Sequence, residues 1–198
     1  MQTNTRALAV AVWPESTNRA LQSVVLVVAG TLVLAISAKI KVPFWPVPMT
    51  LQTLAVMALA AAYGSRLAVA TVIAYLAEGA LGLPVFTNTP PDVASAAYLL
   101  GPTGGFLLAF VVGAAIVGFA ADRGDSRSVV KLAIAMLLAD VVIFALGLLW
   151  LGAAVPKVGY SAKLLSIGLY PFILSDLLKI ALAALAVPAV WGLVDRRS

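Results

Sequence analysis

Long uninterrupted runs of apolar residues dominate the chain, and short polar segments separate them. Six of these runs approach the roughly 20 residues that a helix needs to cross the hydrocarbon core of a bilayer. The runs cover residues 21–38, 49–63, 67–86, 103–121, 129–151 and 168–193. We therefore predict an all-α integral membrane protein with six transmembrane helices.

The second and third runs are separated only by Gly64, Ser65 and Arg66. So short a connection predicts a tight antiparallel hairpin of two helices. Ahead of the first span, one short apolar run is interrupted by Pro14 and Glu15. We divide the chain into an N-terminal cytoplasmic or interfacial segment, residues 1–19, and a six-helix membrane domain, residues 20–198.

The composition supports membrane insertion and weakens most enzymatic interpretations. The chain is 63% apolar and 11% charged, whereas soluble domains are about 45–50% apolar and about 25% charged. It contains no cysteine and no histidine, so it lacks a thiol nucleophile and the commonest general base and metal ligand. We expect no catalytic residue, no metal site and no cofactor. We interpret the net charge of +5 as a signal of orientation rather than of nucleic-acid binding.

The basic residues predict the orientation, because short cytoplasmic loops retain Lys and Arg. If both termini are cytoplasmic, eight of the thirteen cations lie inside and four lie outside. The inner set is Arg6, Arg19, Arg66, Arg123, Arg127, Lys131, Arg196 and Arg197, and the outer set is Lys39, Lys41, Lys157 and Lys163. The same orientation puts nine of the eleven prolines outside. Proline favours rigid, non-helical connections, so we predict structured outer loops that cap a ligand site.

Ionisable residues within the spans are few, and a charge in hydrocarbon needs a partner or a polar cavity. In the last span, Asp176 and Lys179 stand three residues apart, on one face of a helix, where they can neutralise each other. One interpretation is an internal ion pair that locks helices together. We favour a binding site, because a buried acceptor beside a buried donor suits a polar head group in an apolar pocket. Asp140 either lines this cavity or bonds a neighbouring helix, and we favour the structural role.

The segment Gly101-Pro102-Thr103-Gly104-Gly105 precedes the fourth span. It lacks the Lys and Ser/Thr of a phosphate-binding P-loop, so it predicts no nucleotide site. Thr103 can cap the fourth helix, and the amides near it can meet a ligand. A tight loop entering a helix is an equally good interpretation.

Three motifs carry a family resemblance. They are AKIKVPFWPVPMTLQT at residues 38–53, GLPVFTNTP at residues 82–90 and GPTGGF at residues 101–106. In this order they closely resemble the BioY proteins, the biotin-binding S components of energy-coupling factor (ECF) transporters, and the resemblance runs from about residue 21 to residue 194. It implies six helices in a prokaryotic plasma (inner) membrane and an outward-facing biotin site. It also implies a membrane coupling protein and a pair of ATPases as partners.

The resemblance implies site residues as well. The last-helix Asp and Lys of the family match Asp176 and Lys179, and Asn88 matches an amide-bearing residue of the loop after the third helix. Some relatives place a basic residue where this chain has Phe106. Lys179 or the amides near Thr103 are therefore the candidates for holding the biotin carboxylate.

Further candidates come from the outer segments and the third span. Phe44, Trp45 and Tyr98 either cover the bicyclic ring of biotin or anchor the protein at the membrane interface. Glu78 is expected to support the site from a neighbouring helix. On the first helix, Gly30 and Ala29 permit close approach of another helix.

Three classes of function compete. A membrane-embedded enzyme lacks the clustered groups that catalysis needs, and a channel should show polar rings along a pore. We favour the third class, a protein that captures biotin for uptake. The lipid bilayer that surrounds the helices is an expected partner as well. The alternative is a protein of the same fold that binds another small vitamin-like acid, or a structural membrane subunit. Because the chain has no ATP-binding motif, energy for uphill transport must come from partner subunits.

Overall fold

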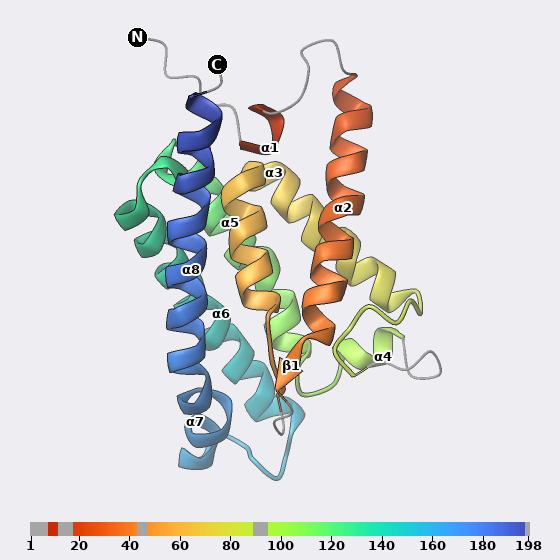
Figure 1. Cartoon of the computed structure of the whole chain (residues 1–198). Coiled ribbons are helices and arrows are strands. Elements are labelled where there is room, and N and C mark those ends of the chain that lie inside the picture. The colour runs from red at the N-terminus through yellow and green to blue at the C-terminus, as the bar shows by residue number, and fades with distance from the viewer. Residues whose placement is uncertain (1–7, 12–17, 43–46, 89–94, 197–198) are drawn as a thin grey trace.

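A computed structural model describes residues 8–11, 18–42, 47–88 and 95–196 of the chain. Over these ranges the protein is almost entirely helical (Figure 1), which confirms the all-α class. Five helical segments there are long and apolar enough to cross a membrane. They are α2 (Arg19–Lys39), α3 (Gln52–Ala80), α5 (Gly104–Asp122), α6 (Val129–Ala154) and α8 (Tyr170–Asp195), the last counted together with the preceding α7 (Ala162–Gly168).

Helix α3 contains the predicted connection between the second and third apolar runs. Gly64 has φ 75° and ψ 174°, a backbone conformation that residues with a Cβ rarely adopt. The arm before Gly64 and the arm after it run in opposite senses along the bundle (Figure 1). The backbone N–H of Ser65 then donates to Asp122 Oδ2 at 3.1 Å, which satisfies a donor in the first turn of the second arm. The change of direction therefore takes a single residue.

Several helix ends differ from the expected ones. The third apolar run was expected to stay helical to residue 86, but α3 ends at Ala80 and Gly82 adopts φ 102°. Residues 83–88 therefore form a loop against the bundle. Thr103 occupies the position before α5 as predicted, yet its side chain makes no capping hydrogen bond, so that part of the prediction is wrong. Its backbone there is already αR, with φ −87° and ψ −10°, whereas a capping side chain usually needs an extended conformation.

Short elements complete the described chain. They are α1 (Leu8–Ala11), the strands β1 (Lys41–Val42) and β2 (Met49–Thr50), α4 (Ala96–Leu99), and the 3₁₀ helix η1 (Asp125–Arg127). The strands pair antiparallel, with Lys41 opposite Thr50. Leu8 of α1 is buried in the hydrophobic core and α1 contacts α3. At Leu8, the N-terminal segment is thus part of the packed molecule.

The centre of the bundle is α5, which packs on α3 and α6. Glycines bring these helices close together: a Cβ on Gly118 would lie 2.5 Å from Ser65 Cα, and one on Gly113 would lie 2.6 Å from Ile143 Cδ1. Small residues of this kind drive helix association in membranes, because they let backbones approach. Gly30 of α2 has the same use, since a Cβ there would lie 2.5 Å from Thr71 Cγ2 of α3.

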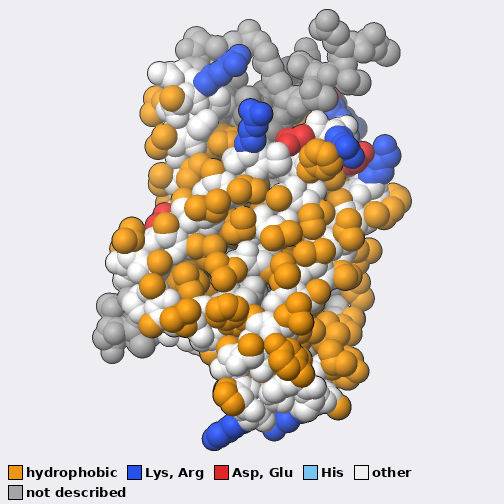
Figure 2. All heavy atoms as spheres, turned by 180° about the vertical axis from the view of Figure 1, so that it is seen from behind, with side chains coloured by type: hydrophobic (Ala, Val, Ile, Leu, Met, Phe, Trp, Pro, Cys, Tyr) orange, Lys and Arg blue, Asp and Glu red, His pale blue; other side chains and the backbone are white. Residues whose placement is uncertain are grey.

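The two ends of the bundle are polar, and the surface between them is apolar. The start of α2, the bend of α3 and the end of α8 lie at one end, whereas β1, α4 and α7 lie at the other (Figure 1). Basic side chains gather at both ends in Figure 2, with hydrophobic side chains over the face between them. Large exposed apolar residues such as Leu32, Ile134 and Leu178 contribute to this surface. A surface of this kind is suited to contact with lipid.

Candidate functional site

A cavity lies among the start of α3, the start of α5, α6 and α8, at the end of the bundle that carries β1 and α4. Its polar lining residues are Thr50, Gln52, Thr53, Thr87, Tyr98, Thr103, Asp140, Asp176 and Lys179. Its apolar lining residues are Val47, Pro48, Phe106, Leu107, Phe110, Ile143, Phe144 and Phe172. The arrangement of a few polar groups in apolar walls is typical of small-molecule sites.

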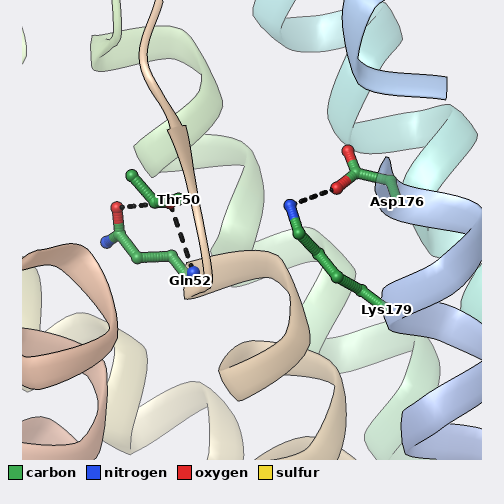
Figure 3. Close-up of polar contacts among 4 residues, drawn as sticks. All are labelled: Thr50, Gln52, Asp176 and Lys179. Carbon is green, nitrogen blue, oxygen red and sulfur yellow. Dashed lines mark hydrogen bonds and ion pairs between the residues drawn. The ribbon is translucent and has the colours of Figure 1, made fainter. Parts of the chain in front are cut away.

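The charged pair of α8 faces this cavity. Lys179 Nζ donates to Asp176 Oδ1 at 2.6 Å (Figure 3), as the three-residue spacing predicted. The residues are 7% and 2% exposed, so both charges are removed from water. In Figure 3 the lysine side chain extends from α8 toward the start of α3, where Thr50 and Gln52 lie. Lys179 has three donors, and the bond to Asp176 uses one of them.

Gln52 organises the opposite wall. Its Nε2 donates to the Tyr75 hydroxyl at 2.9 Å, and its Oε1 accepts from Thr87 Oγ1 at 3.2 Å. The backbone N–H of Gln52 donates to Thr50 Oγ1 at 3.2 Å. The Tyr75 hydroxyl in turn donates to the Val85 carbonyl at 3.1 Å. These bonds tie loop 83–88 to both arms of α3 and fix the Thr87 side chain at the cavity.

Two lysines hold the same loop from the end of α2 and from β1. Lys39 Nζ donates to the Phe86 carbonyl at 2.5 Å, and Lys41 Nζ donates to the Thr87 carbonyl at 3.1 Å. Lys41 also donates to the side-chain oxygen of Asn88. Loop 83–88 is thus bonded to α2, β1 and α3, and it forms a fixed part of the cavity end.

Aromatic rings make much of the remaining lining. Phe106 and Phe144 meet edge to face with centroids 5.9 Å apart, and Phe144 lies 6.0 Å from Phe172. Tyr98 stacks on Phe86 with centroids 4.9 Å apart. Such rings offer a large apolar area of fixed shape.

The predicted site residues fall into three groups. Asp176, Lys179, Tyr98 and Thr103 line the cavity together. Asn88 is exposed and bonds Lys41, and Glu78 is half-buried on the second arm of α3; neither lines the cavity. Phe44 and Trp45 lie outside the described residues.

Asp140 differs from its expected position. We favoured a structural hydrogen bond to a neighbouring helix, but Asp140 lines the cavity, and its buried Oδ1 has no hydrogen-bond partner among the described residues. Asp140, Ile143 and Phe144 share one face of α6, but residues on every face of this helix are apolar, so the sequence does not indicate which face meets the cavity.

Thr50, Gln52 and Thr87 line the cavity and were not among the predicted site residues. Gln52 and Thr87 both belong to the motifs that carry the family resemblance, which was the available signal. In the described part of the chain, no three acidic residues gather where they could hold a metal ion.

Comparison with known proteins supplies the family. Residues 5–196 match the BioY family. The chain is 36% identical over 167 residues to "Biotin transporter BioY" of Thermotoga maritima, covering 81% of this chain and 91% of that protein. It is 32% identical over 171 residues to "Probable biotin transporter BioY" of Pyrococcus horikoshii, covering 86% and 97%.

A solved structure agrees with the fold. The crystal structure of "the S-component for biotin from an ECF-type ABC transporter" superposes with a TM-score of 0.76 at 25% identity, covering 90% of this chain and 95% of that one. The relatives are named as transporters, in line with the expectation that the chain is not an enzyme. The matched residues extend over nearly the whole chain, and the protein belongs to the BioY family.

Proposed function

We propose that this protein captures biotin at the outer side of a prokaryotic plasma membrane, as the substrate-binding subunit of an ECF-type transporter. The observation that carries the proposal is the buried Asp176–Lys179 pair facing a cavity with aromatic walls. Biotin pairs a planar ureido group with a thioether ring and a short acid tail, so it needs polar anchors within apolar surroundings. The names of the relatives and of the solved S-component support the same ligand.

In this proposal the charged pair binds the ureido group. The Lys179 ammonium donates to the ureido oxygen, and the Asp176 carboxylate accepts a ureido N–H. With Lys179 occupied in this way, the amides near Thr103 hold the biotin carboxylate, because the start of a helix favours an anion. Tyr98 contacts the ligand from α4, and Phe44 and Trp45 cover it. Asn88 and Glu78 act as supports of the surrounding structure.

The proposed topology has six crossings and both termini in the cytoplasm. The two arms of α3 count as separate crossings, because the chain reverses at Gly64. The cavity end then faces outward and carries Lys39, Lys41, Lys157 and Lys163, while the arginines lie at the inner end. The outer loops, including loop 83–88, cap the site.

A coupling protein and a pair of ATPases are the proposed partners, because the chain itself has no ATP-binding motif. On α2, Gly30 is buried against α3 and Ala29 is exposed. Only Ala29 of these two residues therefore remains for approach of another helix. Purification under native conditions should recover the coupling protein and ATPases with this chain.

Titration calorimetry of the purified protein in detergent tests the ligand. We expect tight binding of biotin and far weaker binding of lipoate, which keeps an acid tail and a sulfur ring but lacks the ureido group. Equal affinity for the two would remove the claim of ureido recognition and favour a protein of this fold for another vitamin-like acid. No binding of either would leave the structural-subunit alternative.

Single cysteines test the orientation, since the natural chain has none. Lys157→Cys and Arg196→Cys replace exposed residues near opposite ends of the bundle. In intact cells, a membrane-impermeant maleimide should label position 157 and leave position 196 unlabelled until the cells are lysed. The reverse pattern would contradict the proposed topology.

A further inference from the structure

The Asp140 carboxylate is a charged group that the proposed ureido contact does not use. It projects from α6 into the cavity that Asp176 and Lys179 reach from α8, and α6 packs on α8. Its Oδ1 is buried and accepts no hydrogen bond from any described residue. A buried acceptor without a donor costs free energy in the empty protein, and a ligand that donates a hydrogen bond to Asp140 would remove this cost.

The surroundings of Asp140 identify which groups such a ligand meets. Among the described residues, the charged groups that line this cavity are Asp140, Asp176 and Lys179. The neighbouring cavity residues of α6 are Ile143 and Phe144, which have no polar side-chain atom. The cavity thus presents one cation and two carboxylates, together with uncharged polar side chains such as Gln52 and Thr103, between apolar walls.

This set of groups is complementary to a ureido group. A ureido edge carries one carbonyl oxygen between two N–H donors. Lys179 provides a donor for the oxygen, and Asp176 provides an acceptor for one N–H. A second acceptor is then needed, and hydrogen bonds to charged groups are the stronger kind.

Resting on the proposed biotin function, we propose that Asp140 is a ligand-contacting specificity residue, whose carboxylate accepts the second ureido N–H. The two carboxylates bind the two nitrogens and the ammonium binds the oxygen between them. A ligand that has the same acid tail and ring but lacks the two N–H donors should bind more weakly, because it loses the hydrogen bonds to Asp140 of α6 and to Asp176 of α8.

The effects of Asp140→Leu on stability and on binding separate this role from a structural one. Loss of one charge-assisted hydrogen bond should weaken biotin binding by about ten- to a hundredfold in calorimetry. The melting temperature without ligand should stay equal or rise, because the variant removes an unpaired buried acceptor. Asp140→Asn, which keeps the size and one oxygen, should bind with intermediate affinity. Val141→Leu changes the adjacent, exposed residue and should alter neither quantity.

Two modified ligands then identify the contact. Biotin methylated at either ureido nitrogen should bind the unaltered protein more weakly than biotin does. In Asp140→Leu, methylation at one of the two nitrogens should cost little further affinity, while methylation at the other should keep its full effect.

Three results would overturn the inference while leaving biotin capture intact. They are unchanged biotin affinity in Asp140→Leu, a lowered melting temperature without ligand in both Asp140 variants, and full methylation penalties at both nitrogens in Asp140→Leu. Failure of the unaltered protein to bind biotin would instead overturn the proposed function, and this inference with it.

Discussion

Helix α8 carries an aspartate near each of its ends, and each aspartate forms an ion pair of nearly the same length. Lys179 Nζ lies 2.6 Å from Asp176 Oδ1, and Arg127 Nη1 lies 2.5 Å from Asp195 Oδ2. The side chains of the first pair are 9% and 4% exposed, whereas those of the second are 41% and 50% exposed. Distance alone would rank the pairs as equal. Burial makes the two pairs different. Water screens the exposed Arg127–Asp195 pair, whereas in the buried Asp176–Lys179 pair the attraction between the charges must compensate for their desolvation.

The difference extends to the ends of the bundle where the pairs lie. At the cavity end, Gln52, Tyr75 and Thr87 are joined by side-chain hydrogen bonds in the interior. At the opposite end, stability comes from close backbone packing at Gly64 and Gly118. The cavity end thus has a polar interior that keeps charges available to a ligand, whereas the opposite end of the bundle is tightly packed. The predictions below test this contrast.

The largest effect is expected at the buried Asp176–Lys179 pair. Asp176→Asn removes the carboxylate that pairs with the buried Lys179 ammonium at 2.6 Å, which should lower the free energy of unfolding by about 3 kcal/mol. Biotin binding should fall in parallel. Thermal unfolding in detergent and calorimetry measure the two effects, and Asp195→Asn is the matched control on the same helix.

The double variant Asp176→Asn with Lys179→Met separates binding from a structural lock. It removes the Lys179 ammonium together with its partner, so that no buried cation is left without its 2.6 Å ion pair, and it should recover thermal stability. If the pair binds the ligand, biotin affinity should stay low. Recovery of wild-type affinity would mean that the pair only locks helices and that the ligand is held elsewhere.

A smaller effect is expected where backbones meet. In Gly118→Ala, the new Cβ would lie 2.5 Å from Ser65 Cα, and the backbone must shift, at a cost of about 1–3 kcal/mol. Gly192→Ala is the control, since its Cβ would meet nothing within 4 Å. That change should raise stability by about 0.5–1 kcal/mol, because alanine is the better helix former. Equal melting temperatures for the two variants would contradict the packing of α5 against the bend of α3.

The smallest effect is expected at the exposed pair. Asp195→Asn should lower the free energy of unfolding by less than about 1 kcal/mol. The difference from the unaltered protein should shrink further in 1 M salt, where charges are screened within about 3 Å. Arg127 would still lie over the Trp191 ring, at 3.9 Å from its centroid. A loss as large as that of Asp176→Asn would show that exposure does not separate the two pairs.

Features that depend on local sequence could be predicted. Apolar runs located the long helices, the glycine between two of them located the bend of α3, and a three-residue spacing located the Asp176–Lys179 contact. Each of these follows from periodicity or from the conformational range of one residue.

Features that depend on tertiary packing could not be predicted from the sequence. The direction of the Asp140 side chain follows from how α6 turns toward α8, and the apolar surroundings of Asp140 in the sequence are the same on every face. Likewise, Gln52 bonds Tyr75 and Thr87, which lie 23 and 35 residues away in the sequence. The first contact depends on the bend of α3 at Gly64, and the second forms only when loop 83–88 folds back. The short helices α4 and α7 lie in segments without long apolar runs of their own, and such short segments show no clear hydrophobic periodicity that would predict a helix.

The one-residue bend at Gly64 has a consequence for altering the protein. Where helices are joined by an exposed loop of several residues, a tag, a protease site or a fluorescent domain can be inserted into that loop. Here the reversal has no slack, and Gly118 and the Asp122 carboxylate contact the residue that follows it. An insertion at this position would separate the two arms of α3 from the helix that packs against both. The turn at Gly124, between α5 and α6, is the better place for such a graft at the same end of the bundle, because a Cβ at this residue would meet nothing within 4 Å.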